Sequence, residues 1–382
     1  MTEPFDMSFI QRGARLRRSP YFEATQRAGC QSYTVYNHTL LPSYYDDPVV
    51  EYWHLLNHAA LWDVGVERQV EIAGPDAFAF ASLLTPRDLS TCAVGQGKYV
   101  VLTDEEGGIV NDPVLLRLGE NRFWLSTADS DVLLWAKGVA VNAGMDVELS
   151  EPDVSPLQVQ GPKSKAIVHA LFGDRVLGLP YYGFFETSLD GIPVIVTRTG
   201  WTGELGYELY LRDSRRGVEL WDRVMDAGRR HHLKPTGPSD IRRIEAGILN
   251  YGIDMTLSDN PYEVGLGWLV DLGKREDFLG RDVLQRIKKE GVRRRLAGIE
   301  IEGLPIEFNM TRWPVRADGE TVGHATSAIY SPRLRKNIGY AMVPTEHAQL
   351  GTDLTIALPG GERRARVVRK PFIDPGKEIP KG

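Results

Sequence analysis

Hydrophobic and polar positions along the chain follow a pattern that occurs twice. Residues 70–76 predict a strand ending in a Gly-Pro turn, and residues 77–84 (AFAFASLL) predict an apolar helix. Residues 157–163 and 164–172 repeat the strand, the Gly-Pro turn and the helix. A proline just inside a helix start is favourable, because the N–H that it lacks has no partner there. The two segments therefore look like copies of one plan.

The similarity continues beyond both helices. Residues 99–118 and 184–199 each contain two apolar runs joined by an acidic-Gly turn, which is typical of hairpins. A further strand follows each hairpin, at residues 121–127 and 206–211. We interpret this order as an internal duplication of a strand–helix–hairpin unit. The corresponding hairpins are then expected near a pseudo-twofold axis, where a ligand can lie between them.

The later part of the chain has a different pattern of predicted elements. Two helices are predicted at residues 218–229 and 240–249, the second with Ser239 as its N-cap. Beyond these, short strands separated by turns predict an all-β domain, and the tail from Pro371 is expected to be loose. The predicted fold class is α+β, with a first unit at residues 20–150, a second unit at residues 151–290 and a C-terminal all-β domain at residues 291–375.

Composition and charge exclude several classes of protein. The formal net charge of −6 gives no general attraction for nucleic acid or anionic lipid, and no apolar run is long enough to span a membrane. The N-terminal segment lacks the apolar core of a signal peptide, so we expect a cytoplasmic protein. Because Cys30 and Cys92 are isolated and the histidines are scattered, we expect neither a disulfide framework nor a metal site.

Few residues carry recognisable chemistry on their own. The common nucleophile, zinc-protease and phosphate-loop motifs are absent. Three acids stand in apolar surroundings, namely Asp112, Glu208 and Glu245. Strand alternation puts Glu208 and Tyr210 on one face, which either meets water, as in an exposed hairpin, or lines a pocket. For Glu245 we favour a structural ion pair with Arg242, three residues earlier on the same helix.

Five motifs in fixed order carry a resemblance to a known family. They are GPDAFAF (74–80), GQGKYVVLTDEEGGIVNDP (95–113), VQGPKS (159–164), RTGWTGELGYELYL (198–211) and RRIEAGILNYGIDM (242–255). Together they resemble the tetrahydrofolate-dependent aminomethyltransferase (glycine-cleavage T-protein) family, over nearly the whole chain. The resemblance implies two α+β units around a central folate pocket and a C-terminal β-barrel domain.

Three stretches, residues 33–42, 61–72 and 110–114, are more similar to the dimethylsulfoniopropionate demethylases of that family. Aminomethyltransferases usually carry two adjacent acids where this chain has Asn111-Asp112. One loop departs from the demethylase pattern: residues 202–206 (TGELG) are similar to the aminomethyltransferase form and lack its lysine, which could pair with a substrate carboxylate.

The resemblance implies a set of site residues. The catalytic residues would be Asp112 and Asn111. The residues that bind the cofactor, tetrahydrofolate, would be Glu208, Tyr99, Tyr210 and Arg198. The residues that bind the methyl donor would be Trp201, Tyr36, His38 and Arg68. Aromatic rings among them suit an onium cation, although Trp201 could equally be a hairpin aromatic packed on the core.

The leading hypothesis is a demethylase that passes a methyl group from a small donor to tetrahydrofolate. The neutral Asn111 fits methyl displacement, in which the leaving atom needs no proton, better than release of an aminomethyl group. The alternatives are an aminomethyltransferase, which needs a lipoyl carrier protein, and a folate-binding protein without turnover. The expected partner is a small-molecule methyl donor, with no nucleic acid and no membrane, and the protein is expected to be a monomer or homodimer.

Specificity for the donor is where the motifs disagree. If Glu204 in the loop 202–206 points inward, it would repel a carboxylate on the donor. A donor that bears a carboxylate is then expected to be used poorly, unless Arg68 supplies the missing cation.

Overall fold

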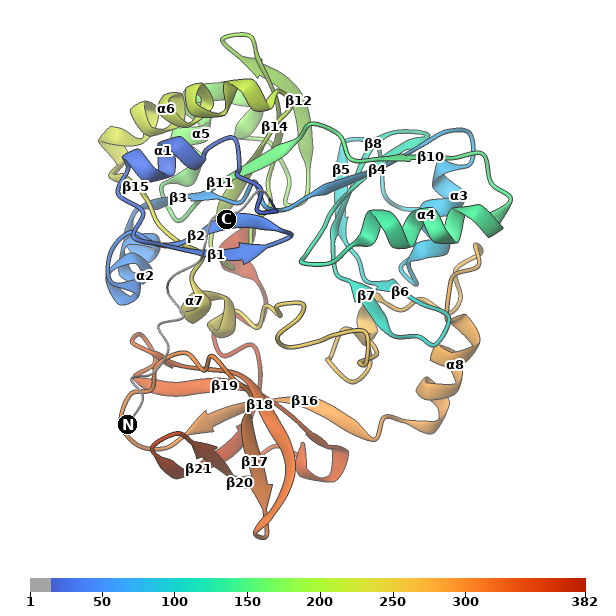
Figure 1. Ribbon diagram of the computed structural model, residues 1–382, viewed down its shortest axis with the longest axis vertical. Coiled ribbons are helices and arrows are strands. Elements are labelled where there is room, and N and C mark those ends of the chain that lie inside the picture. Colours follow the sequence, from blue (N-terminus) through green and yellow to red (C-terminus); the bar gives the residue numbers. More distant parts are fainter. Residues whose placement is uncertain (1–14) are drawn as a thin grey trace.

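The computed structural model describes residues 15–382, which form two helix-covered sheets and a barrel (Figure 1). The N-terminal segment, on which the expectation of no signal peptide rests, lies outside these residues. None of the helices within residues 15–382 combines the length and the apolar character that crossing a membrane requires.

The first sheet has five antiparallel strands in the order β10-β4-β9-β8-β5. Two helices, α3 (Ala77–Leu84) and α4 (Val132–Ala143), pack against it around a core that includes Phe80 and Phe123. The strands are β4 (Gln69–Ala73), β5 (Gln96–Tyr99), β8 (Val114–Gly119), β9 (Arg122–Ser126) and β10 (Glu148–Ser150).

The second sheet has six strands in the order β12-β13-β14-β11-β3-β15, with only β15 parallel to its neighbour. Its outer face is covered by α5 (Ser164–Phe172) and α6 (Gly217–Gly228). The strands are β3 (Ala59–Asp63), β11 (Ser155–Gln160), β12 (Phe184–Leu189), β13 (Ile192–Thr197), β14 (Gly206–Leu211) and β15 (Leu233–Pro235).

Strand order confirms the internal duplication. The run β4-β9-β8-β5 in the first sheet has the same order along the chain as β11-β14-β13-β12 in the second. The predicted strand–helix pairs are β4 with α3 and β11 with α5. The two copies also meet directly, because Gly97 N–H donates to the Tyr182 carbonyl at 2.7 Å and Phe184 N–H donates to the Gly95 carbonyl at 2.9 Å.

The boundary of the first unit needs a correction at its N-terminal end. Strand β3 lies in the second sheet, between β11 and β15, although it precedes the first sheet in the chain. Helix α1 (Phe22–Arg27) packs on α6, and α2 (Pro48–Asn57) contacts β3. Residues 20–63 therefore belong with the second unit. Hydrophobic alternation identified these segments as elements but carried no information about which sheet they join.

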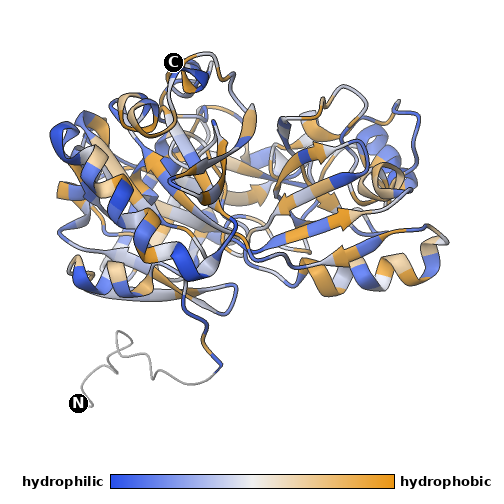
Figure 2. Cartoon of the chain, turned by 90° about the horizontal axis from the view of Figure 1, so that it is seen from above, coloured by the Kyte–Doolittle hydropathy of each residue, from blue (hydrophilic) through white to orange (hydrophobic). Residues whose placement is uncertain are grey.

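The two sheets face each other. A small core of buried side chains from both sheets lies between them, composed of Leu116, Trp124, Val154, Phe184, Ile195 and Tyr210. Hydrophobic residues are concentrated in the strands, while the covering helices alternate between hydrophobic and hydrophilic positions (Figure 2). Each helix therefore buries one side against its sheet and leaves the inner faces of the two sheets to each other.

The C-terminal domain is a closed barrel in the order β16-β19-β18-β17-β20-β21, as the fold class implied. The hydrophobic pattern did not predict β17, because Pro314 interrupts its apolar run. The strands are β16 (Arg294–Ile301), β17 (Trp313–Ala317), β18 (Glu320–Ser331), β19 (Lys336–Pro344), β20 (Asp353–Leu358) and β21 (Gly361–Val368).

The remaining elements connect these three parts. They are the strand pairs β1 (Ser32–Tyr36) with β2 (Thr39–Tyr44) and β6 (Leu102–Thr103) with β7 (Ile109–Asn111), helices α7 (Asp240–Glu245), α8 (Arg281–Glu290) and α9 (Glu378–Lys381), and 3-10 turns at Asp174–Val176, Ser214–Arg216, Arg229–His231, Gly267–Leu269 and Thr345–His347. Ser239 caps α7 by accepting from Arg242 N–H. The helix is shorter than predicted because Gly247, with φ of 71°, turns the chain away.

The C-terminal tail is held in place, which corrects the expectation that it is loose. Helix α9 ends beside Arg198, whose guanidinium donates to the carbonyls of Pro380 and Lys381 and, at 3.0 Å, to that of Leu179. Pro380 is buried. Polar contacts of this kind leave no mark on hydrophobic periodicity, so the sequence pattern did not reveal them.

A buried ion pair fastens α7 to the barrel. Arg243 Nη1 lies 2.5 Å from Asp254 Oδ2, and Arg243 Nη2 donates to Ser327 of β18 at 2.8 Å. Thr326 and Ser327 both donate to the other oxygen of Asp254. Both charged side chains are fully buried. Arg243 also pairs with Asp240 at 2.9 Å, whereas Arg243 is the one cation paired with Asp254 within residues 15–382.

Arg243→Met is expected to lower the free energy of unfolding by about 3–5 kcal/mol, because it leaves Asp254 buried without its cation. Chemical denaturation measures the change. Arg366→Met, which removes an exposed pair with Asp353, is the matched control and should cost less than about 1 kcal/mol. Equal losses in the two variants would contradict the structural role given to Arg243.

Candidate active site between the two sheets

Glu208 of β14 points from the second sheet toward the first. Its carboxylate accepts from Gln158 Nε2 at 2.5 Å, from the Tyr210 hydroxyl at 3.0 Å and from the Thr199 hydroxyl. The side chain is 4% exposed. Burial raises the pKa of Glu208, and the three donors oppose that rise. Glu208 is therefore not on a solvent face, and the exposed-hairpin alternative is wrong.

Glu67 lies beside Glu208, in the loop between β3 and β4. Among residues 15–382, its carboxylate accepts one hydrogen bond, from the Ser126 hydroxyl at 3.1 Å. Gln69 Nε2 in turn donates to that hydroxyl at 2.9 Å. Burial, followed by the charges of Glu208 and Asp112, raises the pKa of Glu67 well above its usual value. Sequence analysis did not select Glu67, although it lies in the stretch 61–72 that resembles the demethylases.

Asp112 follows β7 and completes a group of three acids. The Tyr99 hydroxyl donates to Asp112 Oδ2 at 2.9 Å. Burial raises the pKa of Asp112 to about 7, against the hydrogen bond from Tyr99, with a further contribution from the charge of Asp254. Tyr99 also packs on Trp268, with ring centroids 6.3 Å apart. A carboxyl group with a pKa near 7 is suited to exchange protons at neutral pH.

Tyrosines surround the three acids. Burial raises the pKa of Tyr36, and the charges of Glu67, Asp112 and Asp129 add to the rise. The pKa of Tyr210 is raised by burial and then by Glu208 and Glu67. The structure thus brings six residues together, which we call the acid–tyrosine cluster: Glu67, Asp112, Glu208, Tyr36, Tyr99 and Tyr210.

The cluster has acceptors without matching donors. Within residues 15–382, no lysine, arginine or histidine forms an ion pair with Glu67, Asp112 or Glu208. Two buried amide oxygens next to the cluster, Gln69 Oε1 and Gln158 Oε1, have no hydrogen-bond partner in this part of the chain. Buried acceptors are normally satisfied. The arrangement is therefore complementary to a ligand that brings hydrogen-bond donors, positive charge or both.

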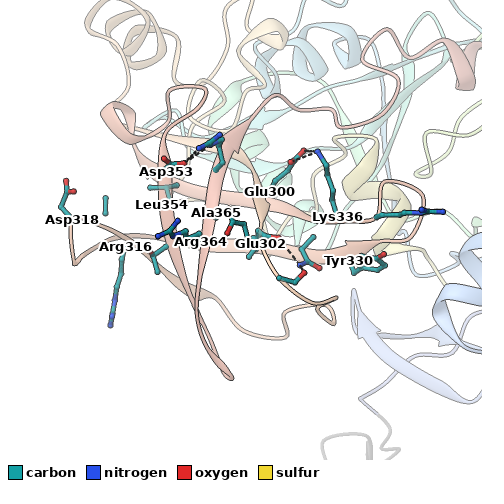
Figure 3. Close-up of a pocket in the computed structure, with 17 residues that line it drawn as sticks. Glu300, Glu302, Arg316, Asp318, Tyr330, Lys336, Asp353, Leu354, Arg364 and Ala365 are labelled. Atoms are coloured by element: carbon teal, nitrogen blue, oxygen red, sulfur yellow. Dashed lines mark hydrogen bonds and ion pairs between the residues drawn. The ribbon is translucent and has the colours of Figure 1, made fainter.

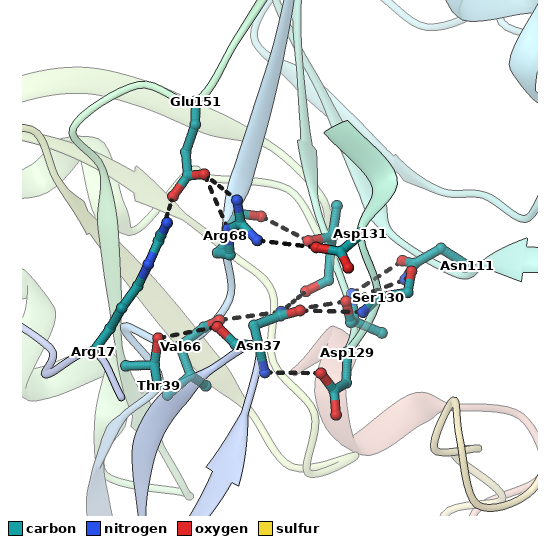
Figure 4. A network of polar contacts seen from close by, with 12 residues as sticks. Arg17, Asn37, Thr39, Val66, Arg68, Asn111, Asp129, Ser130, Asp131 and Glu151 are labelled. Carbon is teal, nitrogen blue, oxygen red and sulfur yellow. Dashed lines mark hydrogen bonds and ion pairs between the residues drawn. The ribbon is translucent and has the colours of Figure 1, made fainter. Parts of the chain in front are cut away.

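Arg68 does not point into the cluster. It forms an ion pair with Glu151, with Nε 3.0 Å from Oε2, and a longer one with Asp131 at 3.6 Å (Figure 4). Both acids compensate the charge of Arg68 in this structure, and its expected contact with a donor carboxylate stays a prediction. Gln69, its neighbour, faces the opposite way, as alternation along β4 requires.

Three further predicted residues lie apart from the cluster contacts. His38 is exposed and has φ of 59°, at the turn between β1 and β2. Trp201 packs on a core of Leu55, Ala60, Trp62 and Val64, as the alternative interpretation proposed. Arg198 is held by the C-terminal tail.

The acid of the loop 202–206 is neutralised. Glu204 is buried and pairs with Arg242 at 2.7 Å, so its charge has a partner. The argument that Glu204 repels a donor carboxylate is therefore wrong. Glu245 depends less on Arg242 than expected: its Oε1 accepts from Tyr52 at 2.7 Å and Ser331 at 2.5 Å, while Arg242 is 3.9 Å from Oε2.

An open groove lies on the barrel, away from the acid–tyrosine cluster. This open groove has a volume of about 740 Å³ (Figure 3). Several of its charges pair with each other, as in Lys336 with Glu300 at 2.8 Å and Arg366 with Asp353 at 2.8 Å. Five basic and four acidic side chains line the groove, and this mixture of exposed, largely paired charges is typical of a solvated surface.

Comparisons with known proteins agree with this architecture. Residues 21–274 match the GCVT N-terminal domain, and residues 294–374 match the glycine cleavage T-protein C-terminal barrel domain. The chain belongs to the glycine-cleavage T-protein family. The solved structure of the glycine cleavage system aminomethyltransferase T from Bartonella henselae matches with a TM-score of 0.85 and 25% identity, over 94% of this chain and 98% of that one.

Two relatives of this T-protein family chain carry different activities. This chain is 38% identical to the dimethylsulfoniopropionate demethylase DmdA of Ruegeria pomeroyi, over 94% of this chain and 98% of the relative. It is 34% identical to an aminomethyltransferase of Symbiobacterium thermophilum, over 94% and 97%. The chain is therefore a tetrahydrofolate-dependent one-carbon transferase, with tetrahydrofolate as the acceptor.

Asn111 has a structural position behind the cluster. Its side-chain N–H groups donate to the Ala128 carbonyl at 3.1 Å and to the Ser130 hydroxyl at 2.9 Å, and its oxygen accepts from Ala128 N–H at 3.0 Å (Figure 4). These contacts occupy both donors of the amide and fix the loop after β9. These contacts position the chain beside Asp112, and the expected catalytic role of Asn111 stays a prediction.

Asn111→Asp is expected to lower the free energy of unfolding by about 1–3 kcal/mol, because a buried acceptor then faces the Ala128 carbonyl without a donor. Thermal or chemical unfolding measures the loss. If Asn111 were instead a reacting group, the variant would keep its stability and change only its turnover. The exposed Asn121→Asp, in the turn between β8 and β9, is the control and should change stability by no more than about 0.5 kcal/mol.

Proposed function

We propose that the protein is a tetrahydrofolate-dependent demethylase that transfers a methyl group from a small onium compound, such as dimethylsulfoniopropionate, to tetrahydrofolate. The observation that supports the proposal is the acid–tyrosine cluster, in which three carboxylates lie together without an ion-pair partner among residues 15–382. A positively charged donor supplies the missing charge, whereas a neutral one does not. The 38% identity to the demethylase of Ruegeria pomeroyi supports the same reaction.

The fit of tetrahydrofolate rests on Glu208 and its neighbours. The amino-pyrimidine edge of the pterin carries adjacent N–H donors, and Glu208, which already accepts three hydrogen bonds, can accept one of them on Oε1. The unpartnered oxygen of Gln158, whose amide N–H is bound to Glu208, can accept a further N–H. Tyr99 and Tyr210 offer rings on either side. These residues would fix both the position and the orientation of the folate.

Bound tetrahydrofolate supplies a secondary amine as the methyl acceptor. During transfer the bond from methyl to sulfur or nitrogen breaks, its electron pair stays with the leaving atom, and the amine N–H becomes acidic. Asp112, with a pKa of about 7, is placed to accept that proton at neutral pH. Tyr99 holds the carboxylate through its hydroxyl.

Most of the rate enhancement would come from placement. Holding an amine and a methyl group in line can contribute roughly 7–11 kcal/mol. Aromatic walls exclude water and favour a transition state in which positive charge is spread over both partners. The register of β11 and β14 fixes Glu208 opposite Gln158, so that the folate anchor is rigid.

A second candidate is aminomethyl transfer. The loop 202–206 and the 34% identity to the aminomethyltransferase of Symbiobacterium thermophilum favour it. It requires proton management at nitrogen by a pair of acids, and this chain has Asn111 beside Asp112. A folate-binding protein without turnover is the third candidate.

The folate product separates the three. Tetrahydrofolate is incubated with the protein and a panel of sulfonium, quaternary ammonium and aminomethyl donors, and the products are resolved by mass. Demethylation gives 5-methyltetrahydrofolate, aminomethyl transfer gives the 5,10-methylene form, and a binding protein gives neither. A methylene product, or none with any donor, would overturn the proposal.

Glu208→Gln is expected to weaken tetrahydrofolate binding by about 10–100-fold, because it removes the charge of a hydrogen-bonded carboxylate. Calorimetric titration with tetrahydrofolate measures the affinity, and unfolding in denaturant serves as the control for stability. An affinity equal to that of the unmodified protein would show that Glu208 does not contact the folate.

The pH dependence of kcat/KM is expected to follow the titration of Asp112. Because burial raises its pKa to about 7, the carboxylate form grows as pH increases, so kcat/KM should rise through about pH 7 and then level off. Asp112→Asn should remove this rise and lower turnover by about 10²-fold. A rise through pH 7 that persists in the variant would assign the titration to another group.

A further inference from the structure

Glu67 is a carboxylate of the acid–tyrosine cluster that takes part neither in the proposed folate binding by Glu208 nor in the proposed proton transfer to Asp112. It is partly exposed to solvent, and burial is the largest of the effects that raise its pKa. Its side chain receives one hydrogen bond, from Ser126, a neutral hydroxyl. The nearest arginine in the sequence, Arg68, is directed to Glu151 and Asp131.

A second and independent observation concerns two side-chain amides. Gln69 donates to Ser126, the partner of Glu67, and Gln158 donates to Glu208. Each amide turns its N–H toward the acids, and its oxygen is buried without a partner among residues 15–382. Turning either amide over would lose a formed hydrogen bond, so the orphaned oxygens are part of the arrangement. Both oxygens are therefore left able to accept a hydrogen bond from a ligand.

The electrostatic balance points to a cation. The charge of Glu208 adds to the effect of burial in raising the pKa of Glu67, and within residues 15–382 neither carboxylate forms an ion pair with a lysine, arginine or histidine. A neutral ligand with N–H donors satisfies Glu208 but leaves Glu67 next to a second charge. An onium group has no N–H to donate, yet it carries a full positive charge spread over its methyl groups. It is therefore the ligand chemistry that compensates Glu67.

We propose that Glu67 is the counter-anion for the methyl donor and selects donors with a positively charged sulfonium or quaternary ammonium centre. The inference rests on the proposed demethylase function and adds the residue that recognises the donor. The ring of Tyr36, which lies close to both Glu67 and Asp112, would form the wall beside the onium methyl groups. Ser126 would keep the carboxylate turned toward the donor.

This role affects binding more than the chemical step. The positive charge is on the donor before transfer and on the folate amine afterwards, so Glu67 stabilises the bound donor at least as well as the transition state. Removing the charge should therefore raise KM for the donor and change kcat little. Binding of tetrahydrofolate through Glu208 should stay the same.

The decisive experiment compares two ligands of the same shape. One is 3-(trimethylammonio)propionate, and the other is 4,4-dimethylpentanoate, in which carbon replaces the charged nitrogen. Calorimetry without tetrahydrofolate measures both affinities. The unmodified protein should bind the cationic ligand about 30-fold more tightly than the neutral one. Glu67→Gln should lose most of this preference, because the variant lacks the negative charge that pairs with the cation.

Two controls keep the experiment interpretable. Glu120→Gln removes an exposed charge in the turn after β8 and should keep the full preference for the cation. Glu67→Asp keeps the charge on a shorter side chain and should retain a reduced preference, so it also serves if Glu67→Gln fails to fold. Calorimetry with tetrahydrofolate shows whether each variant keeps its folate site.

Failure of this inference differs from failure of the proposed function. If the protein makes 5-methyltetrahydrofolate from an onium donor and Glu67→Gln leaves the donor KM unchanged, Glu67 is not the counter-anion, although the function stands. An equal affinity of the unmodified protein for the two isosteric ligands would also overturn the role of Glu67 as counter-anion. If no onium donor yields 5-methyltetrahydrofolate, the proposed function itself is wrong.

Discussion

Burial of a carboxylate between two sheets is the constraint on which the site depends. Glu208 can lie there because Gln158, Thr199 and Tyr210 donate to it, and all three donors belong to the second unit. Glu208 and Gln158 are direct partners across β14 and β11. A shift of one residue in this register would turn every side chain of β14 to the opposite face. The strand pairing that builds the sheet therefore also builds the anchor.

Duplication explains why acids from distant segments meet. The two units place equivalent strands side by side at Gly97 and Tyr182, which brings the inner faces of the sheets together. Asp112 and Glu67 then approach from the first unit and its preceding loop, and Glu208 approaches from the second. Helices cover only the outer faces, so the inner faces are free to carry polar side chains. The barrel is fastened below them through Arg243 and Asp254.

Sequence patterns predicted what depends on local repetition. The strand–helix pairs, the hairpins and the duplicated order followed from periodicity and turn residues, and the family followed from ordered motifs. Patterns did not predict which sheet β3 joins, because pairing partners far apart in the chain leave no periodic signal. The directions of Arg68 and Glu204, and the isolation of Glu67, depend on which charges are neighbours in space. A single sequence does not contain those distances.

The position of β3 also has a consequence during synthesis of the chain. Its partners in the second sheet, β11 and β15, emerge from the ribosome roughly 100 and 170 residues later. At about 5–20 residues per second, β3 waits on the order of ten seconds with its backbone unpaired on both edges. All five of its residues are buried in the finished sheet, including Trp62. Helix α2, which is made just before β3, can cover part of this strand, but the edges of its backbone stay unpaired until the second unit is made.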